Sequence, residues 1–67
     1  MIIYKLKVKG IPESFCIKFE RESQDTIIGV ETDEQGNILS SNGYSESIHI
    51  VAKNKIKKMK EIKIGPR

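Results

Sequence analysis

The chain has 67 residues, of which 37% are hydrophobic and 31% are charged, and its formal net charge is +3. A chain of this length forms one domain with a thin core, so we expect a single domain over residues 1–67, no deep substrate pocket, and a tendency to self-associate. Cys16 is the only cysteine, which excludes an intramolecular disulfide and a cysteine-based zinc site, and no apolar run is long enough to cross a membrane. We therefore expect a cytoplasmic protein without a membrane partner.

The charges are segregated along the chain. Residues 1–9 carry a net charge of +3, residues 10–52 carry −6, and residues 53–67 carry +6. If the two basic ends lie side by side, the protein has one positive face; if they contact the acidic middle, much of the field cancels.

Three strands are expected in the first half of the chain. Residues 2–9 alternate strictly between apolar side chains, expected to face the core, and lysines, expected to face outward. A Gly and a Pro end this strand, and residues 15–20 alternate again as a second strand. Residues 26–32 form the third strand, in which Gly29 indicates a bulge or close packing by a neighbour.

Turn residues follow the third strand. Residues 33–37 have the Asp, Gly and Asn typical of a hairpin loop, and residues 38–40 are expected to start a short fourth strand. Asn42-Gly43 is a strong hairpin signal, although the same residues could form a loop that leads into a helix.

Residues 47–64 decide the fold class, because they can be interpreted in two ways. As a helix over residues 46–60 they place one apolar stripe on the sheet, made of Ile48, Val51, Ala52, Ile56 and Met59. As strands, Ile48 and Ile50 alternate with His49, residues 52–55 turn, and alternation resumes near residue 62. We favour the helix, followed by a short strand or tail at residues 61–64. The predicted class is α+β, an antiparallel meander of three or four strands packed by one C-terminal amphipathic helix; the alternative is a small all-β barrel.

Two family resemblances correspond to these alternatives. Asp33-x-x-Gly36, followed by residues 43–46 and an amphipathic stretch, resembles the strand–loop–helix of HicB-type antitoxins and implies a helix. Gly29, Asp33 and Asn37, with Ile-x-x-Met-x-x-Ile near the end, are similar to small Sm-like or PRC-type barrels and imply strands. We adopt neither resemblance as a family assignment.

The chain offers few groups for catalysis. His49 is the only histidine, and on a strand it is expected to point outward to solvent, away from Ile48 and Ile50. A nucleophilic pair of Cys16 and His49 is formally possible, but nothing in the sequence suggests activation. Asp33 and Asn37 fit a turn rather than a cation loop. We therefore expect no enzyme activity, no metal and no cofactor.

The lysines are the stronger lead. The candidate site for a nucleic acid or an acidic partner consists of Lys5, Lys7, Lys9, Lys53, Lys57, Lys58 and Lys60. On a helix, Lys53, Lys57 and Lys60 would line one side. Because arginine and unburied aromatic residues are scarce, base readout and base stacking lack their usual side chains. We expect a non-catalytic interaction domain that acts through self-association or a protein partner, and the alternative is a nucleic-acid-binding protein with a lysine-rich surface.

Overall fold

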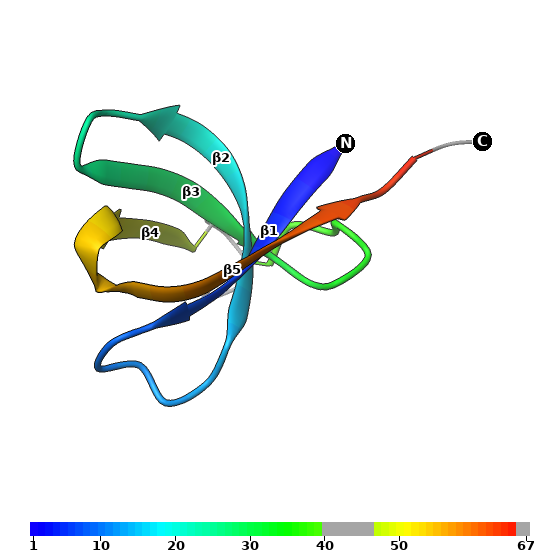
Figure 1. Cartoon of the computed structure of the whole chain (residues 1–67). Coiled ribbons are helices and arrows are strands. Elements are labelled where there is room, and N and C mark those ends of the chain that lie inside the picture. The colour runs from blue at the N-terminus through cyan, green and yellow to red at the C-terminus, as the bar shows by residue number, and fades with distance from the viewer. Residues whose placement is uncertain (40–46, 66–67) are drawn as a thin grey trace.

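The strands of the described residues all belong to one antiparallel sheet. The computed structural model describes residues 1–39 and 47–65. Its strands are β1 (Ile2–Val8), β2 (Phe15–Glu22), β3 (Thr26–Thr32), β4 (Ile48–Ala52) and β5 (Ile56–Lys63), in the order β4-β3-β2-β1-β5. The sheet curls, and the short 3-10 segment η1 (Lys53–Lys55) joins the two edge strands (Figure 1).

The predicted C-terminal helix over residues 46–60 is wrong, and so is the α+β class. The described part of residues 46–60 forms β4, η1 and the beginning of β5, so the protein is all-β, the class of our alternative. The sheet order gives the physical reason. Without β5, one edge of β1 would be unpaired, and without β4, one edge of β3 would be unpaired. Ladder hydrogen bonds and the β-branched Ile48, Ile50 and Val51 then outweigh the helix propensity of the lysines.

The helical stripe also fails residue by residue. Val51 is buried, but Ile48 and Met59 are exposed large hydrophobic side chains. Residues 53–55 supply the only helical turn among the described residues, and none of the helical structure described there is long and apolar enough to span a membrane.

The main core lies inside the curl of the sheet. Leu6, Val8, Ile17, Ile27 and Val51 are buried there. Partly buried side chains, among them Phe15 and Phe19, pack against them. The alternation predicted for residues 2–9 is therefore confirmed at Leu6 and Val8. The close packing predicted at Gly29 is also confirmed, because a Cβ at this position would lie 2.9 Å from Ile17 Cδ1.

A second buried patch lies on the other face of the sheet. Ile3 and Cys16 are buried although they lie on the face of Lys5, opposite to Leu6. The loop of residues 33–37 lies near this end of the sheet, since a Cβ at Gly36 would meet Met1 Sδ at 2.8 Å and Ile64 Cδ1 at 2.9 Å. The hairpin loop predicted at residues 33–37 therefore contributes to the packing of this face.

The short strand predicted at residues 38–40 does not form over the described residues. Ile38 makes only an isolated bridge with Thr32, and residue 40 lies outside the described part of the chain. The predicted Asn42-Gly43 turn and residues 43–46 of the antitoxin resemblance also lie outside the described residues, and the helix that this resemblance implies after them is replaced by β4.

Candidate functional site

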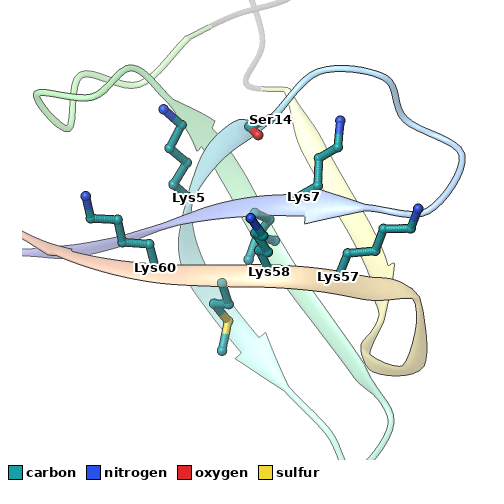
Figure 2. A pocket seen from close by; sticks show the side chains of 8 residues that line it. Lys5, Lys7, Ser14, Lys57, Lys58 and Lys60 are labelled. Carbon is teal, nitrogen blue, oxygen red and sulfur yellow. The ribbon is translucent and has the colours of Figure 1, made fainter.

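Five of the seven candidate lysines surround one open groove beside β1 and β5. The groove has a volume of about 820 Å³ and is lined by Lys5, Leu6, Lys7, Ser14, Lys57, Lys58, Met59 and Lys60. Figure 2 shows the lysine side chains along the two strands, with Ser14 immediately before β2. We call this feature the lysine groove. The two basic ends of the chain therefore do lie side by side.

The strand register explains why these lysines gather. In the ladder between β1 and β5, Lys5 lies opposite Lys60 and Lys7 lies opposite Lys58. The register then shifts, so that Val8 pairs with Ile56 and Lys57 is the additional residue of a bulge. Strand alternation places every second residue on one face, and the bulge adds Lys57 to the pairs that alternation aligns.

Two of the five ammonium groups have partners outside the ladder. Lys5 Nζ donates to Glu34 Oε2 at 2.8 Å, and Lys7 Nζ donates to the carbonyl oxygen of Pro12. The contact with Glu34 raises the pKa of Lys5 and, in return, lowers the pKa of the Glu34 carboxyl, to which the charge of Lys60 also contributes. Glu34 is therefore the acidic side chain that approaches the lysine groove.

The other two candidate lysines lie elsewhere. Lys9 is exposed after the end of β1, where its backbone N–H donates to the Lys55 carbonyl at 2.8 Å. Lys53 lies in η1, and its ammonium forms an ion pair with Glu22 at 2.6 Å. It borders a separate hollow that Tyr4 and Phe19 also line. The helical grouping of Lys53 with Lys57 and Lys60 is thus wrong, because Lys53 lies in η1 whereas Lys57 and Lys60 lie on β5.

Ser14 and Glu34 were not among the residues that the sequence analysis assigned to this site. Glu34 is 29 positions from Lys5 along the chain, and the loop between residues 33 and 37 brings them together. That loop is held by Asp33, whose carboxylate accepts hydrogen bonds from the backbone N–H groups of Gln35 and Asn37 and from Asn37 Nδ2, at 2.8–2.9 Å. These bonds lower the pKa of Asp33, with the Asn37 side chain as the largest cause.

The second surface is the outer edge of β4, which sequence reasoning missed. The Ser47 carbonyl accepts from Glu31 N–H at 2.8 Å, and Lys53 N–H donates to the Asp25 carbonyl at 2.9 Å. In an antiparallel strand, the backbone groups of every second residue form hydrogen bonds with the same neighbouring strand. The backbone groups of His49 and Val51 therefore also point toward β3. The backbone groups of Ile48, Ile50 and Ala52 therefore point away from β3, and no strand of the described residues pairs with that edge.

The side chains of the same edge are apolar and exposed. Ile48 is 62% exposed and Ile50 is 72% exposed, both on the face away from the core. The strand from Ile48 to Ala52 carries no charged residue, whereas β5, at the other edge, carries four lysines. Edge strands are usually protected from pairing by such charges. Of the two edge strands that the structure describes, β4 is the one that lacks this protection.

We expected His49 to point outward to solvent if its segment formed a strand, and this prediction is wrong. It lies on the side of the core, where its ring stacks on Phe15 with ring centroids 4.5 Å apart and Nε2 lies 2.9 Å from Glu31 Oε1. Because β3 carries Ile27 and Glu31 on the same face as Val51 and His49, the core side of this strand is the His49 side. Ile48 and Ile50 lie on the outward side.

Cys16 and His49 do not converge. Cys16 follows Phe15 in β2, so its side chain lies on the opposite face from the ring that His49 stacks upon. The thiol is buried, and burial raises its pKa, which keeps it protonated near neutral pH. Over residues 1–39 and 47–65, no three His, Cys, Asp or Glu side chains gather in a way that could hold a metal ion.

Comparison of the chain with protein-family models, with curated proteins and with solved structures finds no match. The lysine groove and the edge of β4 are therefore the observations from which a function can be inferred.

Proposed function

We propose that this protein is a non-catalytic interaction domain that acts through self-association, and that a second copy of the chain pairs with the outer edge of β4. The observation that supports this proposal is the combination, on one uncharged strand, of outward-pointing backbone groups and exposed isoleucines. Such an edge is a template for addition of another strand.

The pairing geometry follows from symmetry. A twofold axis that brings two identical strand edges together makes them antiparallel. The backbone groups that point outward belong to Ile48, Ile50 and Ala52, so a register with Ile50 opposite Ile50 also pairs Ile48 with Ala52. This register forms about six backbone hydrogen bonds, two for each directly opposed pair.

The chemistry of the edge favours a second copy over a partner of different sequence. Directly opposed like charges destabilise a strand pair, and residues 48–52 bring none to a self-pairing. Because residues 48–52 carry no charged side chain, they also have no group that would select a charged partner strand by an ion pair. A domain of 67 residues also has a small core, and dimerisation buries apolar surface that the monomer leaves exposed.

Replacement of Ile50 tests the proposal. Each dimer contains two copies of Ile50, and full burial of an isoleucine contributes about 1.5–3 kcal/mol. Partial cover by one neighbouring strand should contribute about 2 kcal/mol per dimer in total, so Ile50→Lys should weaken dimerisation about 30-fold or more. Because Ile50 is mostly exposed in the monomer, the variant should keep its fold.

Sedimentation equilibrium over a concentration series measures the effect. The unsubstituted protein should shift from monomer to dimer, Ile50→Lys should remain monomeric, and Ile11→Lys should dimerise normally. Ile11 is a suitable control because it is also an exposed isoleucine but lies between β1 and β2. Hydrogen exchange should slow at the Ile50 amide as the concentration rises. A protein that stays monomeric throughout, or two variants that dimerise equally well, would overturn the proposal.

A further inference from the structure

The lysine groove contains like charges in direct opposition. Lys5 faces Lys60 and Lys7 faces Lys58 across the ladder between β1 and β5. Directly opposed like charges are destabilising in an antiparallel pair, because their Cβ atoms are only about 5 Å apart. The sheet therefore forms this cluster at a cost to its own stability, and an anion in the groove would remove that cost.

The charge of the cluster is only partly offset within the chain. Glu34 forms an ion pair with Lys5 and lies near enough to Lys60 for the charge of Lys60 to lower its pKa. No other carboxylate of the described residues forms an ion pair with a lysine of the groove. Five ammonium groups thus face one carboxylate, and a negatively charged ligand is the complementary one.

The shape of the groove suits a chain rather than a small enclosed molecule. The groove is open and runs along β1 and β5, with the lysines on its rim (Figure 2). Lysines two positions apart on one strand, such as Lys58 and Lys60, are spaced by about 6.6 Å. A polymer that repeats single negative charges along its length can contact several of them at once.

The residue types favour phosphate over carboxylate. Every cation that lines the groove is a lysine, which binds phosphate as a point charge, whereas planar carboxylates are held best by the fork of an arginine. The Ser14 hydroxyl adds a donor of the kind that contacts phosphate oxygens. The lining contains no aromatic side chain and no arginine, so it has no means to stack on bases or to read their edges.

From these observations we infer that the lysine groove binds the phosphodiester backbone of nucleic acid without sequence preference. This function is separate from self-association, because it uses β1 and β5 rather than the edge of β4. If the four lysines other than the Glu34-paired Lys5 each neutralise one phosphate, the logarithm of the binding constant should fall with the logarithm of salt concentration with a slope of about −3 for a single strand.

Fluorescence anisotropy with labelled poly-dT, poly-U and a mixed-sequence DNA duplex tests the inference at several salt concentrations. The unsubstituted protein should bind poly-dT and poly-U with similar affinity and with the steep slope given above. The double variant Lys58→Gln, Lys60→Gln should bind at least 10-fold more weakly, with a slope of about −1.5. Its melting temperature should equal or exceed that of the unsubstituted protein, because both opposed lysine pairs are removed.

The matched control is the double variant Lys9→Gln, Lys63→Gln, which loses the same charge from exposed residues outside the lining of the groove. It should bind nearly as well as the unsubstituted protein. Equal weakening by the two double variants would overturn the inference, since a general charge effect would then suffice. It would also be overturned by no binding at low salt, or by poly-glutamate binding as tightly as poly-dT.

Discussion

Replacement of Gly29 by alanine probes the closest packing in the sheet. A Cβ on Gly29 would lie 2.9 Å from Ile17 Cδ1 and 2.9 Å from the carbonyl oxygen of Lys18, against an optimal carbon–carbon separation of about 3.5–4.0 Å. Ile17 is fully buried, and the Lys18 carbonyl belongs to the neighbouring strand, so neither can move away easily. Overpacking of this kind costs about 1–3 kcal/mol.

A small gain opposes that cost. Alanine restricts the unfolded chain more than glycine does, which stabilises the fold by about 0.4–1 kcal/mol where the backbone accepts it. The net loss for Gly29→Ala should therefore be about 1–2 kcal/mol, which lowers the melting temperature of a domain of this size by about 5–15 °C. Thermal and urea unfolding followed by circular dichroism measure both quantities. Gly65→Ala, where nothing lies within 4 Å, should leave both unchanged.

A double-mutant cycle identifies the cause. Ile17→Val removes the Cδ1 atom and by itself should cost about 0.5–1.5 kcal/mol. In the Gly29→Ala background it should cost less, because it also relieves one of the two close contacts, and the difference is the coupling energy. If Gly29→Ala melts like the unsubstituted protein, or if the two changes add without coupling, the packing described at Gly29 is incorrect.

Two further predictions concern titratable groups. The hydrogen bonds from Asn37 and Gln35 give the Asp33 carboxyl a folded pKa below its ordinary value of 3.8, so its contribution to stability is present above that value and is lost as the pH falls through the lowered pKa. Urea unfolding across the acid range should show a weaker pH dependence for Asp33→Asn, and an unchanged acid limb would contradict this assignment. The raised pKa and burial of the Cys16 thiol predict slow reaction with a thiol-specific disulfide reagent in the native protein and fast reaction in urea. Equal rates in both states would show that the thiol is accessible.

The strands that could be predicted are those with local signals. The alternation of residues 2–9, the aromatic alternation after Phe15 and the run around Gly29 depend on neighbours in sequence, and β1, β2 and β3 form there. Residues 47–64 carry two periodicities at once, and the choice between them depends on which strand edges need a partner. That requirement arises from β1 and β3, distant in sequence, so propensity and spacing favoured the wrong structure.

The candidate site was predictable in composition but not in arrangement. The alternating lysines of residues 5–9 and the basic end of the chain pointed to a positive surface. The cross-strand pairs Lys5–Lys60 and Lys7–Lys58 depend on the register, which the bulge at Lys57 alters. The exposed edge of β4 could not be predicted for a related reason. Which face of a strand points outward depends on its neighbours, and isoleucines are ordinarily expected to face a core.

The position of β1 in the sheet has a consequence for the order of folding. The first strand of the chain lies between β2 and β5, so it obtains one neighbour from the next segment and the other from the last. Pairs such as Ile2 with Lys63 close nearly the whole chain into one loop, and contacts of such long range form slowly. The hairpins of β1, β2 and β3 can form early, while β1 keeps one unpaired edge until β5 docks. The lysine groove forms only when β5 docks on β1, so the presence of the groove would show that folding is complete.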